Sequence, residues 1–171
     1  MKTRVFLVLL PAVLICFLSS PVSAGNTLLG EARALFAKRQ YDQAIALVKK
    51  ETKKSGERAD LLVVMADSYL ALGKEKKAGK IYRLALELDP GNTDATLNLA
   101  MLLVADRKRD EAIAMIDRVL DEHPNHAKAH FCLGMAYNAK ADINDAFAQY
   151  KILKKLDETL AAELYDAIFL K

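Results

Sequence analysis

The side chains best suited to chemistry lie close together in the last third of the chain. They are three histidines and a cysteine, His123, His126, His130 and Cys132. His126 and His130 are four residues apart, a spacing that places both on one face of a helix and can chelate a metal ion. We find no carboxylate or second cysteine that completes a tetrahedral set with them, and the stretch around His123 is typical of a turn. We therefore expect no metal site.

Cys132 and His130 are also poor partners for nucleophilic catalysis. Side chains two residues apart on a helix point away from each other, and no Asn or Asp is placed to orient the histidine. Ser and Thr are sparse, there is no Gly-rich phosphate loop, and no pair of carboxylates stands out from the solvated helix faces. The expected protein is not an enzyme and uses no cofactor and no small-molecule substrate.

The composition is that of one folded domain. The chain has 171 residues, of which 53% are hydrophobic and 27% charged, with few Gly and Pro, as in a helical globular protein. Its net charge of +3 includes Lys2 and Arg4 at the extreme N-terminus. Residues 25–171 hold 23 basic and 22 acidic residues, so we expect no nucleic-acid surface.

The first 24 residues have the pattern of a secretory signal peptide. Lys2 and Arg4 are followed by an apolar run over residues 5–18 and by small residues up to Ala24. As a helix this run rises only about 21 Å, against a hydrocarbon core of about 30 Å. We expect cleavage after Ala24 and export to the periplasm; the alternative is an uncleaved segment that anchors the chain in the inner membrane. A lipid on Cys16 is disfavoured because Ile15 precedes it.

Small residues recur every 34 positions, at Ala44, Ala78, Ala112 and Ala146. Pro90 and Pro124 are also one such interval apart. The period divides the chain into four units, 25–58, 59–92, 93–126 and 127–160, with a remaining tail. In unit 59–92 two apolar stripes at helical spacing flank a polar turn, which predicts a pair of helices. Such pairs bury their apolar faces only by stacking, so the tail, 159–171, is expected to form a capping helix.

This pattern resembles the tetratricopeptide repeat, a 34-residue helix–turn–helix unit. Unit 59–92 matches best, with the motif residues Ala66, Tyr69, Leu72-Gly73, Ala78, Tyr82, Ala85 and Asp89-Pro90. The first unit lacks the Leu-Gly pair and the Pro, and Glu158 stands where the last unit should have Pro, so a continuous helix is expected there. The resemblance implies an all-α, right-handed solenoid of four repeats plus a C-terminal capping helix.

The resemblance also implies a concave groove, lined by the first helix of each unit, that receives a protein or peptide partner. The groove residues expected from it are Arg33, Phe36, Val63, Asp67, Leu70, Leu97, Asn98, Met101, Lys128, Phe131, Met135 and Asn138. We expect a mostly apolar groove, with Leu70, Leu97, Met101, Phe131 and Met135 as its binding patch. The family's carboxylate clamp corresponds to the positions of Val63, Asp67, Asn98, Lys128 and Cys132. Only Asn98 and Lys128 match it, which disfavours binding of a chaperone tail.

Two functions follow as expectations. The first is an adaptor in the cell envelope, in an assembly of the secretion, pilus or cytochrome-maturation kind. The alternative is a structural homo-oligomer that uses the groove or the apolar tail Ile168-Phe169-Leu170 against another copy. The basic stretches, among them 74–80 and 107–109, are interleaved with acids and are expected to be solvated faces.

Overall fold

The computed structural model describes residues 21–170, so most of the predicted signal peptide lies outside the described residues. All regular structure in this part of the chain is α-helical. The helices are α1 (Pro21–Ala37), α2 (Tyr41–Ser55), α3 (Ala59–Ala71), α4 (Glu75–Leu88), α5 (Thr93–Ala105), α6 (Arg109–Glu122), α7 (Ala127–Ala139), α8 (Ile143–Leu156) and α9 (Glu158–Phe169). Between residues 21 and 170 no helix is both long enough and apolar enough to cross a membrane.

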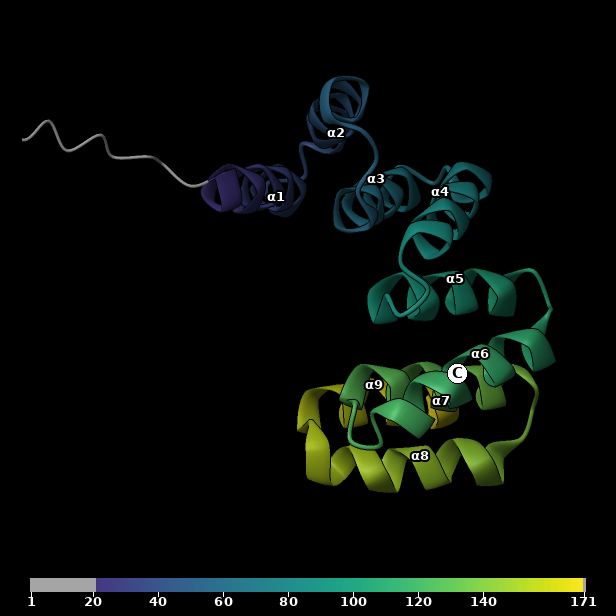
Figure 1. Cartoon of the computed structure of the whole chain (residues 1–171). Coiled ribbons are helices and arrows are strands. Elements are labelled where there is room, and N and C mark those ends of the chain that lie inside the picture. The colour runs from purple at the N-terminus through teal and green to yellow at the C-terminus, as the bar shows by residue number, and fades with distance from the viewer. Residues whose placement is uncertain (1–20, 171) are drawn as a thin grey trace, which may run out of the picture.

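The helices stack in chain order into a curved array, with α1 near one end and α8 and α9 at the other (Figure 1). Each odd-numbered helix up to α7 packs against the even-numbered helix that follows it, and each even-numbered helix packs against the next odd-numbered one. This is the expected all-α repeat solenoid. Among the first helices of the units, α1 approaches α3 and α5 approaches α7 closely, whereas the backbones of α3 and α5 stay farther apart.

The residues of the 34-residue period explain the close packing inside each unit. Ala44, Ala78, Ala112 and Ala146 are fully buried, because only a small side chain lets two helix backbones cross closely. Tyr82, also fully buried, fills the space beside Ala78 in the second unit. The periodic alanines therefore set the distance between helices, and the larger side chains fill the core around them.

The turn inside each unit repeats one backbone conformation. Arg39, Gly73, Arg107 and Ala141 are spaced 34 residues apart, and all four have a positive φ, between 59° and 69°. The sequence indicated this turn only through Leu72-Gly73, since glycine alone adopts the left-handed region without steric cost. Three of the four units thus hold a side chain in a strained turn.

Replacing Ala141 by glycine should relieve that strain and raise the free energy of unfolding by about 1 kcal/mol, or roughly 2–4 °C in melting temperature. The control is Ala148→Gly at an exposed position inside α8, where glycine should instead cost about 1 kcal/mol. Thermal melts of the two variants should move in opposite directions. A loss of stability in both would mean that the turn at Ala141 is not strained.

The last helix is separate from α8, so the expectation of a continuous helix at Glu158 is wrong. Asp157 has an extended backbone, with φ −158° and ψ 103°, and its carboxylate accepts hydrogen bonds from the backbone N–H groups of Thr159 and Leu160. An aspartate in this position caps a new helix without a proline. α9 then packs on α7 and α8 and buries Ala161, Leu164 and Ile168.

Candidate functional site

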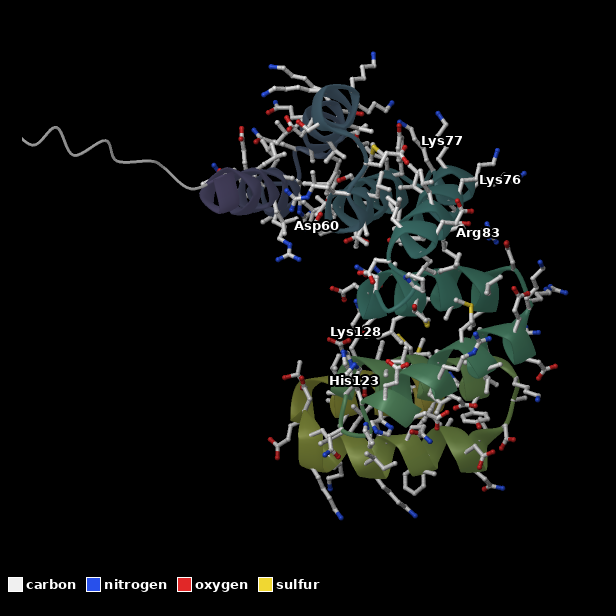
Figure 2. The ribbon with its side chains drawn as sticks, in the orientation of Figure 1. Asp60, Lys76, Lys77, Arg83, His123 and Lys128 are labelled. Atoms are coloured by element: carbon white, nitrogen blue, oxygen red, sulfur yellow. The ribbon has the colours of Figure 1, made fainter. Side chains whose placement is uncertain are left out.

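A cavity of about 380 Å³ lies on the inner side of the solenoid, among the first helices of the four units. It is lined by Arg33 and Phe36 of α1, Val63, Val64 and Asp67 of α3, Asp94 and Asn98 of α5, and Lys128 of α7. Six of the twelve groove residues expected from the sequence are among them. In Figure 2, Lys128 and Asp60 lie on the side of the first helices, whereas Lys76, Lys77 and Arg83 lie on the outer side of α4.

The predicted apolar patch is wrong in part, because the structure buries some of its members. Leu97 has no exposed surface, so it cannot touch a partner. Phe131 and Met135 are partly buried against the core that α9 completes. Leu70 and Met101 are half-buried, and each packs against the core of its own part of the solenoid.

Two further groove residues are nearly covered. Val63 is 7% exposed, and Asn138 is 8% exposed and donates a hydrogen bond to the carbonyl of Ala167 in α9. The groove residues that stay accessible around the cavity include Arg33, Asp94 and Lys128, which are charged. The site is therefore polar at its centre, not mostly apolar as the sequence suggested.

Asp67 lies at the centre of a polar network between the second and third units. Its Oδ1 accepts hydrogen bonds from the Tyr82 hydroxyl and from Asn98 Nδ2, the latter at 2.8 Å. Burial raises the pKa of Asp67, while the hydrogen bonds from Tyr82 and Asn98 and the charge of Lys128 oppose the shift. Burial and the nearby Asp67 also raise the pKa of Tyr82, so its hydroxyl stays protonated and acts as the donor.

Asp67→Asn should keep both hydrogen bonds, because an amide oxygen accepts as the carboxylate does, while it removes a buried charge. Since the folded-state pKa is raised, the ionised carboxylate costs stability once the pH exceeds that pKa. The wild type should therefore be less stable than Asp67→Asn at pH 7, and the two should converge as the pH falls to about 4.

Asp67→Ala is the contrasting variant. It leaves the buried Tyr82 hydroxyl without its acceptor and should lower the free energy of unfolding by about 1–3 kcal/mol at both pH values. Urea titrations at pH 4 and pH 7 measure both effects. Equal losses for Asp67→Asn and Asp67→Ala at pH 7 would contradict this account.

Lys128 joins the third and fourth units across the groove. Its ammonium lies 3.1 Å from Asp94 Oδ1, and both side chains are about half exposed, at 42% and 58%. A pair this exposed adds little to stability. The pair holds the Lys128 ammonium beside the cavity, which Arg33 and Asp67 also line.

The two residues that match the family's carboxylate clamp contact acidic residues of this chain. Asn98 donates to Asp67 and Lys128 is paired with Asp94, so both matching residues already have partners in this chain. Val63 and Cys132, which stand at other clamp positions, are 7% and 3% exposed.

The histidines and the cysteine have structural roles in the fold. His126 caps α7, since its Nδ1 accepts from the backbone N–H of Ala129. His130 is buried with Nε2 2.8 Å from the carbonyl of Pro124 and Nδ1 2.7 Å from the amide of Gln149; because a carbonyl only accepts, Nε2 carries the proton. Burial raises the pKa of the Cys132 thiol to about 11, which leaves it protonated at neutral pH. Within residues 21–170, no three His, Cys, Asp or Glu side chains gather to hold a metal ion.

Sequence reasoning missed two contacts of the site, the pair of Asp94 with Lys128 and the hydrogen bond from Tyr82 to Asp67. Asp94 and Lys128 stand at the same position of successive units, 34 residues apart, so a comparison of charges across units could have paired them. Tyr82 was placed in the core stripe, and nothing in the period indicates that its hydroxyl reaches Asp67 on the facing helix. These contacts make the centre of the groove a set of fixed charges and hydrogen-bonding groups.

Comparison with known proteins agrees with this architecture. Two models of the tetratricopeptide repeat match the chain, over residues 29–93 and 69–131. Among solved structures, YrrB, described as a TPR protein with an unusual peptide-binding site, is 24% identical with a TM-score of 0.68, over 85% of this chain and 76% of its own. TTC0263, a thermophilic TPR protein of Thermus thermophilus, is 19% identical with a TM-score of 0.72, over 84% of this chain and 82% of its own.

A third similar structure is MamA of AMB-1, at 20% identity and a TM-score of 0.63, over 86% of this chain and 78% of its own. No curated protein sequence matches the chain. At these identities the likeness shows a common fold.

Proposed function

The chain belongs to the tetratricopeptide-repeat family, which makes it a protein–protein interaction scaffold, and from this premise we propose that it is an adaptor of the cell envelope. In this proposal a segment of a partner protein lies in the groove between α1, α3, α5 and α7. The bound segment is held by the polar centre of the groove, and no bond of the partner is made or broken.

The observation that carries the proposal is the cavity to which all four units contribute a first helix. Packed helices lie about 9 Å apart and an extended peptide rises about 3.3 Å per residue, so each unit would face about three residues of a bound strand. Arg33 and Lys128 offer cations, and Asp67 and Asp94 offer carboxylates, along that path. A polar groove of this kind suits a peptide backbone and charged side chains better than a purely apolar segment.

Two other observations support a peptide as the ligand and the cell envelope as the location. YrrB, with a similar fold, is described as having a peptide-binding site, which supports a peptide as the ligand here. The basic, apolar and small-residue pattern of residues 1–24 supports export to the envelope, where the chain would begin at Gly25 or stay anchored by the uncleaved segment.

Site-specific crosslinking in living cells tests the proposal. A photoreactive phenylalanine analogue replaces Met101 in the groove, and the matched control replaces Met115, which lines a different cavity among α4, α5 and α6. We expect a discrete adduct with an envelope protein from Met101 and none from Met115. The same adducts from both positions, or adducts only from Met115, would place the working surface outside the groove.

A further inference from the structure

The exposed apolar surface of the described residues is concentrated at the C-terminal end. Seven large apolar side chains of the described residues are exposed, and six of them lie beyond residue 142: Ile143, Ile152, Leu156, Tyr165, Phe169 and Leu170. Within the described residues, no further repeat stacks on α8 and α9. On α9 itself, Tyr165, Phe169 and Leu170 are 42%, 47% and 71% exposed, whereas Ile168 of the predicted apolar tail is buried.

Aromatic side chains pack against one another at this end of the molecule. Phe169 lies 4.8 Å from Tyr165 and 5.9 Å from Phe147 between ring centroids, and Tyr150 lies 5.4 Å from Tyr165. On the α8 side, Lys151 sits 4.9 Å above the ring of Phe147. An aromatic cluster that is already ordered loses little conformational entropy when a partner covers it.

The charges of α9 are all acidic. It carries Glu158, Glu163 and Asp166 and no basic residue, and Glu158 and Asp166 border Tyr165. Lys154 of α8 lines the same small cavity, so a basic group of α8 lies beside these acids of α9. We call Tyr165, Phe169, Leu170, Glu158 and Asp166 the α9 face.

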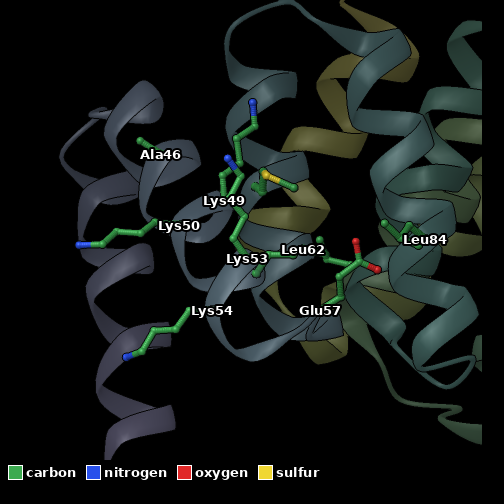
Figure 3. A pocket seen from close by; sticks show the side chains of 10 residues that line it. Ala46, Lys49, Lys50, Lys53, Lys54, Glu57, Leu62 and Leu84 are labelled. Carbon is green, nitrogen blue, oxygen red and sulfur yellow. The ribbon is translucent and has the colours of Figure 1, made fainter.

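The opposite end of the molecule has the complementary properties. A cavity of about 710 Å³ opens between α2 and α4. Ala46 and Leu84 are the accessible apolar residues of its lining, whereas Leu62 and Met65 of α3 are only 1% and 8% exposed. Its rim carries four lysines of α2 and one acid: Lys49, Lys50, Lys53, Lys54 and Glu57. Figure 3 shows the lysines along α2, with Leu62 and Glu57 between them and Leu84. We call this the lysine cavity.

The lysine cavity is particular to the N-terminal units. One repeat later, Leu86 stands in place of Thr52 and Arg118 in place of Leu84, and the corresponding cavity measures only about 280 Å³. None of the four rim lysines forms an ion pair with any of the described acids, and Lys49 instead lies 5.6 Å from the centre of the Tyr69 ring.

The whole chain is polarised in the same sense. Residues 25–92 hold 13 basic and 9 acidic residues, net +4, whereas residues 93–171 hold 10 basic and 13 acidic residues, net −3. Two copies placed end to end therefore attract each other, and two copies placed acidic end to acidic end repel.

We propose that the α9 face of one copy docks into the lysine cavity of a second copy. Phe169, Leu170 and Tyr165 would lie against the apolar lining, while Glu158 and Asp166 would meet the rim lysines. A second copy is the occupant because this chain itself carries both halves of the complementary pair, apolar anchors with acids at one end and an apolar cavity with lysines at the other. The contact is heterologous, so it builds an open chain of copies or a closed ring.

Sedimentation velocity of the purified protein tests the proposal. We expect association that grows with protein concentration and weakens between low salt and 0.5 M salt, because the rim charges are solvent-exposed. Lys49→Glu with Lys53→Glu should weaken association by about tenfold or more, and so should Glu158→Lys with Asp166→Lys. A chain that carries all four reversals should associate again, which a variant that merely misfolds would not do.

The matched control is Lys76→Glu with Lys77→Glu on α4, which removes equal charge outside the cavity lining and should leave association unchanged. A wild type that stays monomeric at every concentration overturns the proposal. Association that ignores the Lys49 and Lys53 reversals also overturns it, and assigns the contact to α9 against α9. Binding of anionic phosphatidylglycerol vesicles by a monomeric wild type, lost in the Lys49 and Lys53 variant, would make the cavity a membrane contact instead.

Discussion

A single methyl group added at Gly134 is expected to loosen the last helix from the solenoid. Gly134 lies inside α7, and a Cβ at this position would overlap Leu164 Cδ2 of α9 and lie 3.0 Å from its Cδ1 and 3.3 Å from Gln149 Cβ. Leu164 is fully buried, so we expect its side chain to move aside only by displacing packed neighbours. Gly134→Ala should therefore lower the free energy of unfolding by about 1–3 kcal/mol, although alanine favours the helix by about 1 kcal/mol.

The matched control is Gly79→Ala on α4, also a buried glycine in a helix. Its added Cβ would lie 3.6 Å from Arg83 Nη1 and Leu102 Cδ1, an ordinary van der Waals contact, so this variant should gain up to about 1 kcal/mol. Urea unfolding followed by circular dichroism measures both changes. The opposite signs expected for two glycine-to-alanine changes separate overpacking from helix propensity.

A double-mutant cycle identifies the clashing partner. Leu164→Ala alone should cost about 2–5 kcal/mol because it empties a buried site. In its presence Gly134→Ala should cost less than it does alone, with a coupling energy of about 1 kcal/mol or more. Additive losses in the double variant would show that Gly134 and Leu164 do not meet.

The second large effect is expected in the groove. Once crosslinking has identified the partner segment, Met101→Asp should weaken its binding at least about thirtyfold, which corresponds to about 2 kcal/mol. Met101 is half-buried and also packs against the core of the third and fourth repeats, so a charge there opposes burial of the partner and the melting temperature of the variant has to be measured beside its binding. Titration calorimetry with the segment as a synthetic peptide measures the change.

Two further substitutions in the groove are compared with Met101→Asp. Lys128→Ala should weaken binding only a few fold and in a salt-dependent way, because its ammonium is partly exposed and already paired with Asp94. Phe131→Ala is a poorer probe than the sequence suggested, since Phe131 packs against two core clusters and its loss should also lower stability. If binding survives Met101→Asp but is lost when Arg107, Lys108 and Arg109 are reversed in charge, the partner lies on the outer side.

The repeat architecture could be predicted from the sequence because it depends on spacing. Ala44, Ala78, Ala112 and Ala146 recur every 34 residues, which predicts that the two helices of each unit cross at the same point. Four units that follow one another without an insertion predict that the units stack. Processing at Ala24 and the envelope location involve residues 1–20, which lie outside the described residues, and stay predictions.

The character of the groove could not be predicted in the same way. Leu97 and Phe131 occupy equivalent positions of successive units, yet Leu97 is fully buried and Phe131 is not. Burial at this position depends on the angle by which one unit is rotated against the next. The 34-residue spacing of the sequence does not specify that angle. The bond from Tyr82 to Asp67 depends on the same geometry, since it joins two helices through the ends of their side chains.

The wider separation between α3 and α5 has a mechanical consequence. Elsewhere successive first helices meet through a close backbone contact. At this joint α5 packs on α4 instead, and α3 is joined to α5 by the hydrogen bond from Asn98 to Asp67. A tightly packed interface between helices resists bending because any displacement opens voids in it. A hydrogen bond beside a cavity allows one helix to rotate slightly against the other. We therefore expect the solenoid to bend more easily between its second and third repeats than within either pair of repeats.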